Sequence, residues 1–255
     1  MDTDYQELVK LGVAANRAER LIQSELPWWR KKRRRVGRQW PHLEVGGDCL
    51  RIGKTTTKQV LAEQIGKRGW PLVFSDEDWK DNPYLKRAYA GSAASLLNSQ
   101  LWFAKKKRSQ LTNISDSSFW IQVVNPEMDW AYAMTNFLSG NLSERQWLRY
   151  WREYQALGWE SVPFPDLLIY LTASVEVLLE RFIRTARDFE AADEKYIRVM
   201  QLVNQRWLRL AEKKRQVLVI DTNHFDYSNL TGTARAREQL GRQLFTRLAE
   251  VGWEY

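Results

Sequence analysis

The segment Gly53-Lys54-Thr55-Thr56 limits the folds open to this 255-residue chain more than any other feature. A glycine, a lysine and a hydroxyl residue in this order form the exit of a phosphate-binding loop. In such a loop the lysine grips the β- and γ-phosphates and the hydroxyl holds Mg²⁺. The loop joins a strand to a helix, so the motif predicts an α/β fold. Gly53, Lys54, Thr55 and Thr56 are therefore the predicted nucleotide-binding residues, with Thr55 as the metal ligand.

The entrance of the same loop departs from the pattern. Asp48 stands where the first glycine is expected, and Gly47 lies one residue too early. Leu50 and Ile52 are bulky, although small residues normally let the backbone approach phosphate closely. The chain therefore keeps the residues that grip a triphosphate but alters the cradle that organises them.

Composition fits one large globular domain, since 44% of the residues are hydrophobic and 27% are charged. No run of eighteen apolar residues and no charged-then-apolar leader is visible, so we expect no membrane span, no secretion, and a cytoplasmic or organelle-interior location. The single Cys49 excludes an internal disulfide. With only His42 and His224 beside it, the chain has no zinc-type ligand set.

The net charge of +8 is concentrated near the N-terminus, where residues 1–40 hold ten Lys/Arg against five Asp/Glu. We expect two parts: an N-terminal helix with a basic, Trp-flanked extension over 1–40, and a catalytic-type domain over 41–255. Residues 28–40 suit nucleic acid, an anionic surface or a protein complex, because cations neutralise phosphates and tryptophans stack on bases. A solvated linker is the alternative. The basic residues are Arg30, Lys31, Lys32, Arg33, Arg34, Arg35 and Arg38.

Hydrophobic periodicity predicts the remaining elements. Five short apolar strands alternating with helices indicate a doubly wound, five-stranded parallel α/β sheet with an appended N-terminal helix. The expected strands cover 43–45, 71–74, 119–124, 167–171 and 217–221. The expected helices cover 4–25, 55–65, 84–110, 129–138, 143–157, 174–184, 191–213 and 232–251.

From Glu44 to Tyr227 the order of elements and several local strings resemble the deoxynucleoside kinase family, P-loop enzymes that phosphorylate the 5′-hydroxyl of deoxynucleosides. The strings that carry the resemblance are Asp81-Asn82-Pro83-Tyr84-Leu85, Pro165 to Leu171 followed by Glu176 to Arg181, Arg187-Asp188-Phe189-Glu190, and Val217 to Asp221. The resemblance implies a P-loop kinase fold, ATP and Mg²⁺ as cofactors, and a homodimer through the long helices.

The resemblance also assigns a substrate side. Glu77 matches the base that activates the 5′-hydroxyl, which is a poor nucleophile until its proton is taken. Tyr89 and Gln100 reproduce an eleven-residue interval, about three turns of one helix, that places a sugar-binding tyrosine and a base-reading glutamine on the same face. Asp129 matches an acceptor for an exocyclic amino group, which hints at a cytosine or adenine nucleoside. Glu190 matches the lid glutamate that holds the 3′-hydroxyl.

The phosphate side departs from the family again after the loop. The acid-arginine-serine string at the end of the third strand is replaced by Val123-Val124-Asn125 in an ungapped alignment. The register with Asp116-Ser117-Ser118 also lacks the arginine. In the lid, Arg187 remains as the catalytic arginine together with Arg181, whereas the middle position is Thr185, and Arg184 stands one residue away.

Two functional hypotheses follow. The first is an ATP-dependent deoxynucleoside kinase with a divergent phosphate site, in which Lys54, Glu77 and Arg187 carry the catalysis. Such a loss of arginines matters, because one arginine on a transferring phosphoryl group is worth about 10³ to 10⁵ in rate. The second hypothesis is a catalytically inactive kinase-fold subunit or adaptor, a pseudokinase, that docks on a larger complex through its N-terminal extension.

Overall fold

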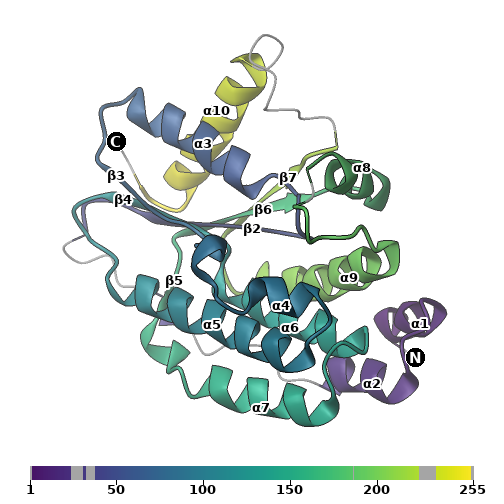
Figure 1. Ribbon diagram of the computed structural model, residues 1–255. Coiled ribbons are helices and arrows are strands. Elements are labelled where there is room, and N and C mark those ends of the chain that lie inside the picture. Colours follow the sequence, from purple (N-terminus) through teal and green to yellow (C-terminus); the bar gives the residue numbers. More distant parts are fainter. Residues whose placement is uncertain (1, 24–30, 33–37, 186, 224–233, 254–255) are drawn as a thin grey trace.

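A parallel sheet of five strands forms the centre of the molecule, in the spatial order β3-β4-β2-β6-β7 (Figure 1). The computed structural model describes residues 2–23, 31–32, 38–185, 187–223 and 234–253. The sheet confirms the doubly wound α/β fold expected from the sequence. Its strands are β2 (His42–Gly47), β3 (Leu72–Ser75), β4 (Phe119–Val123), β6 (Leu167–Thr172) and β7 (Val217–Asp221).

Helices cover both faces of the sheet, which is why the central strands are continuous apolar runs. Leu43 of β2 lies beside Ile121 of β4 and Leu167 of β6, and all three side chains are fully buried. One face carries α3 (Lys54–Gly66) and α10 (Ala234–Glu250). The other carries α5 (Ala93–Thr112), α6 (Pro126–Leu138), α7 (Glu144–Gln155) and α9 (Glu194–Ala211). The helix α8 (Val175–Thr185) packs against α9.

The expected helix over 84–110 is wrong, because the chain forms two helices there. The short α4 (Leu85–Tyr89) ends before Gly91, whose φ of +88° is a left-handed conformation that a helix interior does not accommodate. Ser92 then caps α5 by accepting a hydrogen bond from the Ser95 amide. Tyr89 and Gln100 therefore do not share a helix, and their helical spacing does not explain their positions.

The N-terminal helix expected over 4–25 is likewise two helices, α1 (Thr3–Lys10) and α2 (Ala15–Gln23). Gly12 separates them with a φ of +75°. They contact α9 and α6, and Arg206 of α9 donates hydrogen bonds of 2.9 Å to Asp2 and Asp4. Their buried residues Leu8, Ala18 and Leu21, and Val13 between the two helices, join the apolar core on that face of the sheet. The division of the chain near residue 40 stays a prediction.

Shorter elements complete the described chain. A two-residue strand, β1 (Lys31–Lys32), pairs in parallel with β5 (Pro163–Phe164), an association that the sequence did not indicate. Two 3₁₀ turns lie at η1 (Trp79–Asp81) and η2 (Trp159–Ser161). Within the described ranges no helix combines the length and the apolar character that a membrane crossing requires.

Candidate functional site

The phosphate-binding loop runs from β2 to α3, as the motif predicts. Gly53 caps α3 with a φ of +101°, a left-handed conformation open to glycine without steric cost. A Cβ at Gly47 would lie 2.8 Å from the Leu171 carbonyl oxygen and 2.9 Å from a methyl carbon of Ile52. Gly47 is therefore required for the close approach of the loop to β6.

The carboxylate of Asp48 is buried and fixes the entrance of this loop. It accepts hydrogen bonds from the Tyr170 hydroxyl at 2.9 Å and from the side-chain amide of Gln201 at 3.3 Å. The Asn204 amide donates to the Asp48 carbonyl oxygen at 3.0 Å. Burial raises the pKa of Asp48 to about 6, and the hydrogen bond from Gln201 partly opposes that shift. Asp48 thus faces β6 and α9 and acts as an anchor of the loop.

Two hollows meet beside the loop. The first measures about 720 Å³ and is lined by the loop, the start of α3 and arginines of the α8 region. The second measures about 390 Å³ and lies among α4, α5, α6 and the start of α9. Their shared walls are Leu50, Glu77, Trp79 and Arg187. Glu77 therefore lies at the boundary between the two hollows, where a molecule bound in one would meet a molecule bound in the other.

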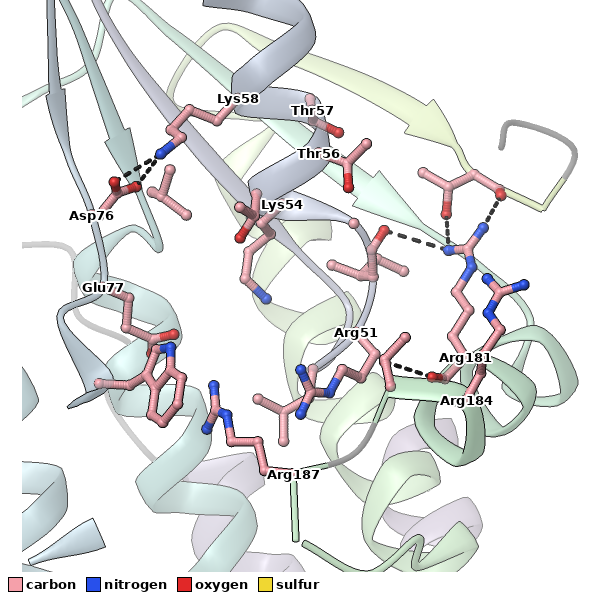
Figure 2. A pocket seen from close by; sticks show the side chains of 18 of the residues that line it. Arg51, Lys54, Thr56, Thr57, Lys58, Asp76, Glu77, Arg181, Arg184 and Arg187 are labelled. Carbon is pink, nitrogen blue, oxygen red and sulfur yellow. Dashed lines mark hydrogen bonds and ion pairs between the residues drawn. The ribbon is translucent and has the colours of Figure 1, made fainter. Parts of the chain in front are cut away.

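Lys54, from the start of α3, and Glu77, from the segment after β3, both line the first hollow (Figure 2). The Lys54 ammonium donates to the Cys49 carbonyl oxygen at 3.0 Å and to the Tyr132 hydroxyl at 3.3 Å. Burial lowers the pKa of Lys54, while the nearby carboxylate of Glu77 opposes that shift. A buried ammonium with few fixed partners can exchange them for phosphate oxygens at little cost.

The start of α3 supplies neutral oxygen donors to the same hollow. Thr55 and Thr56 both line it, and Thr55 is exposed. Asp76 also lines it, but its carboxylate is already bound by the Lys58 ammonium at 2.7 Å. No cluster of three metal-ligating His, Cys, Asp or Glu side chains occurs among the described residues. The Thr55 hydroxyl at this hollow is an oxygen ligand that suits Mg²⁺ whose remaining ligands come from phosphates and water.

The lid arginines divide into bound and available side chains. Arg181 donates to the carbonyl and hydroxyl oxygens of Thr222 at 2.5 and 2.9 Å, which ties α8 to the end of β7. The guanidinium carbon of Arg187 lies 3.7 Å from the centre of the Trp79 ring, and its Nη1 donates to Oε1 of Glu190 at 2.9 Å. Arg184 and Thr185 are exposed and line the hollow. All three arginines line the first hollow, but the Arg181 guanidinium is held by Thr222 and Arg187 by Glu190, whereas Arg184 is exposed.

Tyr89 and Gln100 line the second hollow together, although they belong to α4 and α5. The centres of the Tyr89 and Phe189 rings lie 5.3 Å apart, and Glu190 follows Phe189 in the chain. Glu190 itself lines only the first hollow, where it bonds Arg51 and Arg187. The structure thus brings two of the four expected substrate residues to one hollow, and the sugar-binding role of Glu190 stays a prediction.

Asp129 lines neither hollow. It lies one turn before Tyr132 on α6 and is buried, with no hydrogen-bond partner for Oδ2 among the described residues. Burial raises the pKa of Asp129 to about 8, and the Lys107 ammonium opposes that shift. The base-reading role of Asp129 therefore stays a prediction, and in the folded protein its buried side chain is largely a neutral acid at pH 7.

Several residues of the second hollow had no sequence signal of their own. Tyr132 and Asn136 follow Asp129 at intervals of three and seven on α6, so the helical spacing would have placed them on the same face. The Asn136 amide donates to the Tyr196 hydroxyl at 3.1 Å, which joins α6 to α9 across the hollow. Trp79 and Phe189 are neighbours of predicted residues, and no sequence pattern predicted a separate role for them.

The strand end that lacks the family's arginine has an unusual backbone. Val124 adopts a φ of +62°, which is a conformational outlier for a β-branched residue. It is fully buried, and the Lys107 ammonium donates to the adjacent Val123 carbonyl at 2.8 Å. Asn125 is also buried and donates to Glu127 at 2.8 Å. No cation from this strand end reaches the first hollow.

The basic N-terminal tract is described only in part. Residues 24–30 and 33–37 lie outside the described residues, and so does His224. Arg38 is buried, and its guanidinium donates to both oxygens of Asp166, at 2.8 and 2.9 Å. Arg38 therefore contributes to the fold, and a nucleic-acid role for the rest of residues 28–40 stays a prediction.

Comparison with known proteins identifies the family. The model of the family "deoxynucleoside kinase" matches residues 48–244 of this chain. The chain belongs to the deoxynucleoside kinase family. This confirms the resemblance and makes nucleoside phosphorylation the general chemistry associated with the fold.

Relatives of this deoxynucleoside kinase family member are known from bacteria. Deoxyguanosine kinase of Bacillus subtilis (strain 168) is 28% identical over 195 residues, which cover 73% of this chain and 89% of the relative. Deoxyadenosine/deoxycytidine kinase of the same organism is 26% identical over 142 residues, covering 54% and 63%. Deoxyadenosine kinase from M. mycoides with bound dATP superposes with a TM-score of 0.65 at 18% identity, covering 80% of this chain and 99% of that one. At that identity the likeness concerns the fold alone.

Proposed function

We propose that this protein transfers the γ-phosphoryl group of ATP to the 5′-hydroxyl of a deoxynucleoside. The observation that carries the proposal is the position of Glu77, at the shared wall of the two hollows. The first hollow collects Lys54, Thr55 and four arginines, as a triphosphate requires. The second is lined by aromatic rings and side-chain amides, as a nucleoside requires.

Glu77 acts as the general base in this proposal. The nucleoside 5′-oxygen bonds to the γ-phosphorus, the bond from that phosphorus to the bridging oxygen of ADP breaks, and the hydroxyl proton passes to the Glu77 carboxylate. Lys54 neutralises the β- and γ-phosphates, and Arg187 adds charge from the lid. Mg²⁺ would be held by Thr55 and would neutralise charge on the phosphates. The chain's own residues thus position both reactants and accept the proton.

The nucleoside is held by groups from several elements. Tyr89 would bind the sugar 3′-hydroxyl, and Gln100 would present its amide to the base. Glu190 would release one of its two arginine partners and bind the sugar 3′-hydroxyl together with Tyr89. Asp129, three residues before Tyr132 on α6, would read the base. As a carboxylate it would accept from an amino group of adenine or cytosine, whereas as a neutral acid it can also donate.

Transfer of phosphate from γ-labelled ATP to deoxyadenosine, deoxycytidine, deoxyguanosine and thymidine tests the proposal, with and without EDTA. Glu77→Gln should lower kcat about 10²- to 10⁴-fold, the usual contribution of a general base. Asp78→Asn is the matched control, because the Asp78 carboxylate lies 3.2 Å from the Lys106 ammonium and lines neither hollow. A wild-type protein that phosphorylates none of the four nucleosides would contradict the catalytic proposal.

The second candidate is an inactive kinase-fold subunit, favoured by one observation. Val124 and its buried neighbours occupy the strand end from which an arginine would reach the phosphates. The two N-terminal helices already bury Leu8, Ala18 and Leu21 in the core beside α9 and α6, so in this candidate we expect docking to depend on residues 24–37. Deleting residues 24–37 and comparing elution from cell extract tests this candidate. Unchanged elution contradicts it.

Assembly is a separate proposal. We propose a homodimer through the long helices, as in the family expectation, and binding of residues 28–40 to an anionic partner. Sedimentation equilibrium measures the first, and a monomer at all concentrations contradicts it. A mobility shift with DNA and RNA at increasing salt measures the second, because phosphate contacts weaken steeply with ionic strength.

A further inference from the structure

Arg51, inside the phosphate-binding loop, has an unfavourable backbone conformation. Its φ is +59°, in the left-handed region that glycine enters freely and other residues enter at a cost of about 1 kcal/mol. A glycine would avoid that cost at this position. Backbone strain of this kind is characteristic of functional sites, where the surrounding structure holds the residue in place.

The side chain of Arg51 lies in the first hollow. Its guanidinium bonds the carboxylate of Glu190, which also accepts from Arg187, and it lies 5.7 Å from the centre of the Phe182 ring. The Arg51 side chain is 21% exposed, whereas the Glu190 side chain is 1% exposed. Among the described residues Arg51 makes one hydrogen bond, through Nη2. A guanidinium has five N–H donors, so others remain for a second anion.

Two other positions that could bring a cation to this hollow differ from Arg51. Arg181 is held by Thr222, and Val124 offers no charge from the end of β4. Lys54 and Arg51 belong to the same loop; burial is the main cause of the lowered pKa of Lys54, and the charge of Arg51 adds to it. The loop therefore places an arginine beside its own lysine, at the hollow that a triphosphate would occupy.

We infer that Arg51 contacts the transferring phosphoryl group from within the loop, in the role that an arginine at the end of β4 would otherwise have. Glu190 holds the guanidinium in the free protein. This inference rests on the proposed function. As the nucleoside oxygen bonds to the γ-phosphorus and the bond to ADP breaks, the guanidinium neutralises charge on the γ-phosphate oxygens. It transfers no proton.

Arg51→Gln, Arg51→Lys and Arg51→Gly test the inference in the full chain. Arg51→Gln should lower kcat about 10³-fold, the lower range for an arginine on a transferring phosphoryl group, with little change in the nucleoside KM. Arg51→Lys should have a kcat almost as low as that of Arg51→Gln, because an ammonium lacks the planar, forked donors of a guanidinium. Arg51→Gly removes the backbone strain, so its melting temperature should be retained, and added guanidinium should recover part of its activity. Arg149→Gln, which loses an exposed ion pair with Glu153, is the matched control.

Calorimetric titration with ATP and with ADP gives a second readout that does not need turnover. Arg51→Gln should lose about tenfold in ATP affinity and keep its ADP affinity, because a charged hydrogen bond to the γ-phosphate is lost. If the wild type fails to phosphorylate any nucleoside but shows this selective loss, the proposed function fails while the contact stands. Unchanged kcat together with unchanged ATP affinity overturns the inference. Equal losses for ATP and ADP, without guanidinium rescue, also overturn it, because they indicate a structural role.

Discussion

The Tyr170 hydroxyl donates a 2.9 Å hydrogen bond to Oδ1 of Asp48, and both residues are fully buried. This contact ties the entrance of the phosphate-binding loop to β6. A glycine at position 48 could not make it. The substitution that makes the loop look damaged in the sequence therefore supplies an anchor to the adjacent strand and to α9.

The Asp48 anchor has a pH dependence. Its pKa of about 6 in the folded protein lies above the value of 3.8 for the free side chain, because burial disfavours the carboxylate. The folded state consequently binds more protons than the unfolded state between these pH values, so stability falls as pH rises from about 4 to 6. The unfolding free energy falls by about 3 kcal/mol in total over this range, at about 1.4 kcal/mol per pKa unit.

Asp48→Asn should remove this dependence, because the amide cannot ionise and keeps an oxygen for the Tyr170 hydroxyl. Urea unfolding of both proteins at pH 4.5, 5.5 and 7 measures it. Relative to the wild type, the Asp48→Asn protein should gain unfolding free energy as pH rises from about 4 to 6. Parallel curves for the two proteins would contradict the buried-carboxylate account.

Asp129 gives a second window, at higher pH. Its pKa of about 8 means that the folded protein keeps a proton that the unfolded chain loses above about pH 4. Stability should therefore fall as pH rises from about 4 to 8, after which this contribution is constant. Asp129→Asn should flatten the unfolding free energy between pH 6 and 8, whereas Asp48→Asn should not. A variant with the wild-type slope over that interval would contradict this assignment.

The sequence could predict the sheet, because each strand is a short apolar run with its own boundary residues. It could not predict the breaks at Gly12 and Gly91, where one glycine in a left-handed conformation divides a continuous helical pattern. Lys54, Thr55 and Glu77 reach the expected hollow because they flank strands at the same edge of the sheet. Glu190 differs, because its position depends on two arginines that no local pattern connects to it. The Asp48 anchor likewise depends on contacts with β6 and α9, far along the chain.

The ion pair of Arg38 and Asp166 should be a large stabilising contact only while both partners are present. The Arg38 side chain is 1% exposed, and the His42 amide also donates to Asp166 at 2.8 Å. Asp166→Ala leaves a buried cation unpaired and should cost about 3 to 5 kcal/mol in unfolding free energy. Glu153→Ala, which removes a surface carboxylate paired with Arg149 and Lys105, should cost about 1 kcal/mol or less. Equal effects in urea unfolding would contradict the role of burial.

The close approach at Gly47 can be tested against a matched glycine. A methyl group at position 47 would meet the Leu171 carbonyl at 2.8 Å, and that backbone oxygen also accepts the Asp48 amide at 3.0 Å. Gly47→Ala should therefore cost about 1 to 3 kcal/mol, the usual range for overpacking, and should disturb the loop that carries Lys54. Gly66→Ala is the control, because a Cβ at Gly66, at the end of α3, meets nothing within 4 Å. Since alanine favours helix over glycine by up to about 1 kcal/mol, that variant should be neutral or more stable. Thermal unfolding of both variants decides the comparison, and a Gly47→Ala protein as stable as Gly66→Ala would show that the loop can withdraw from β6.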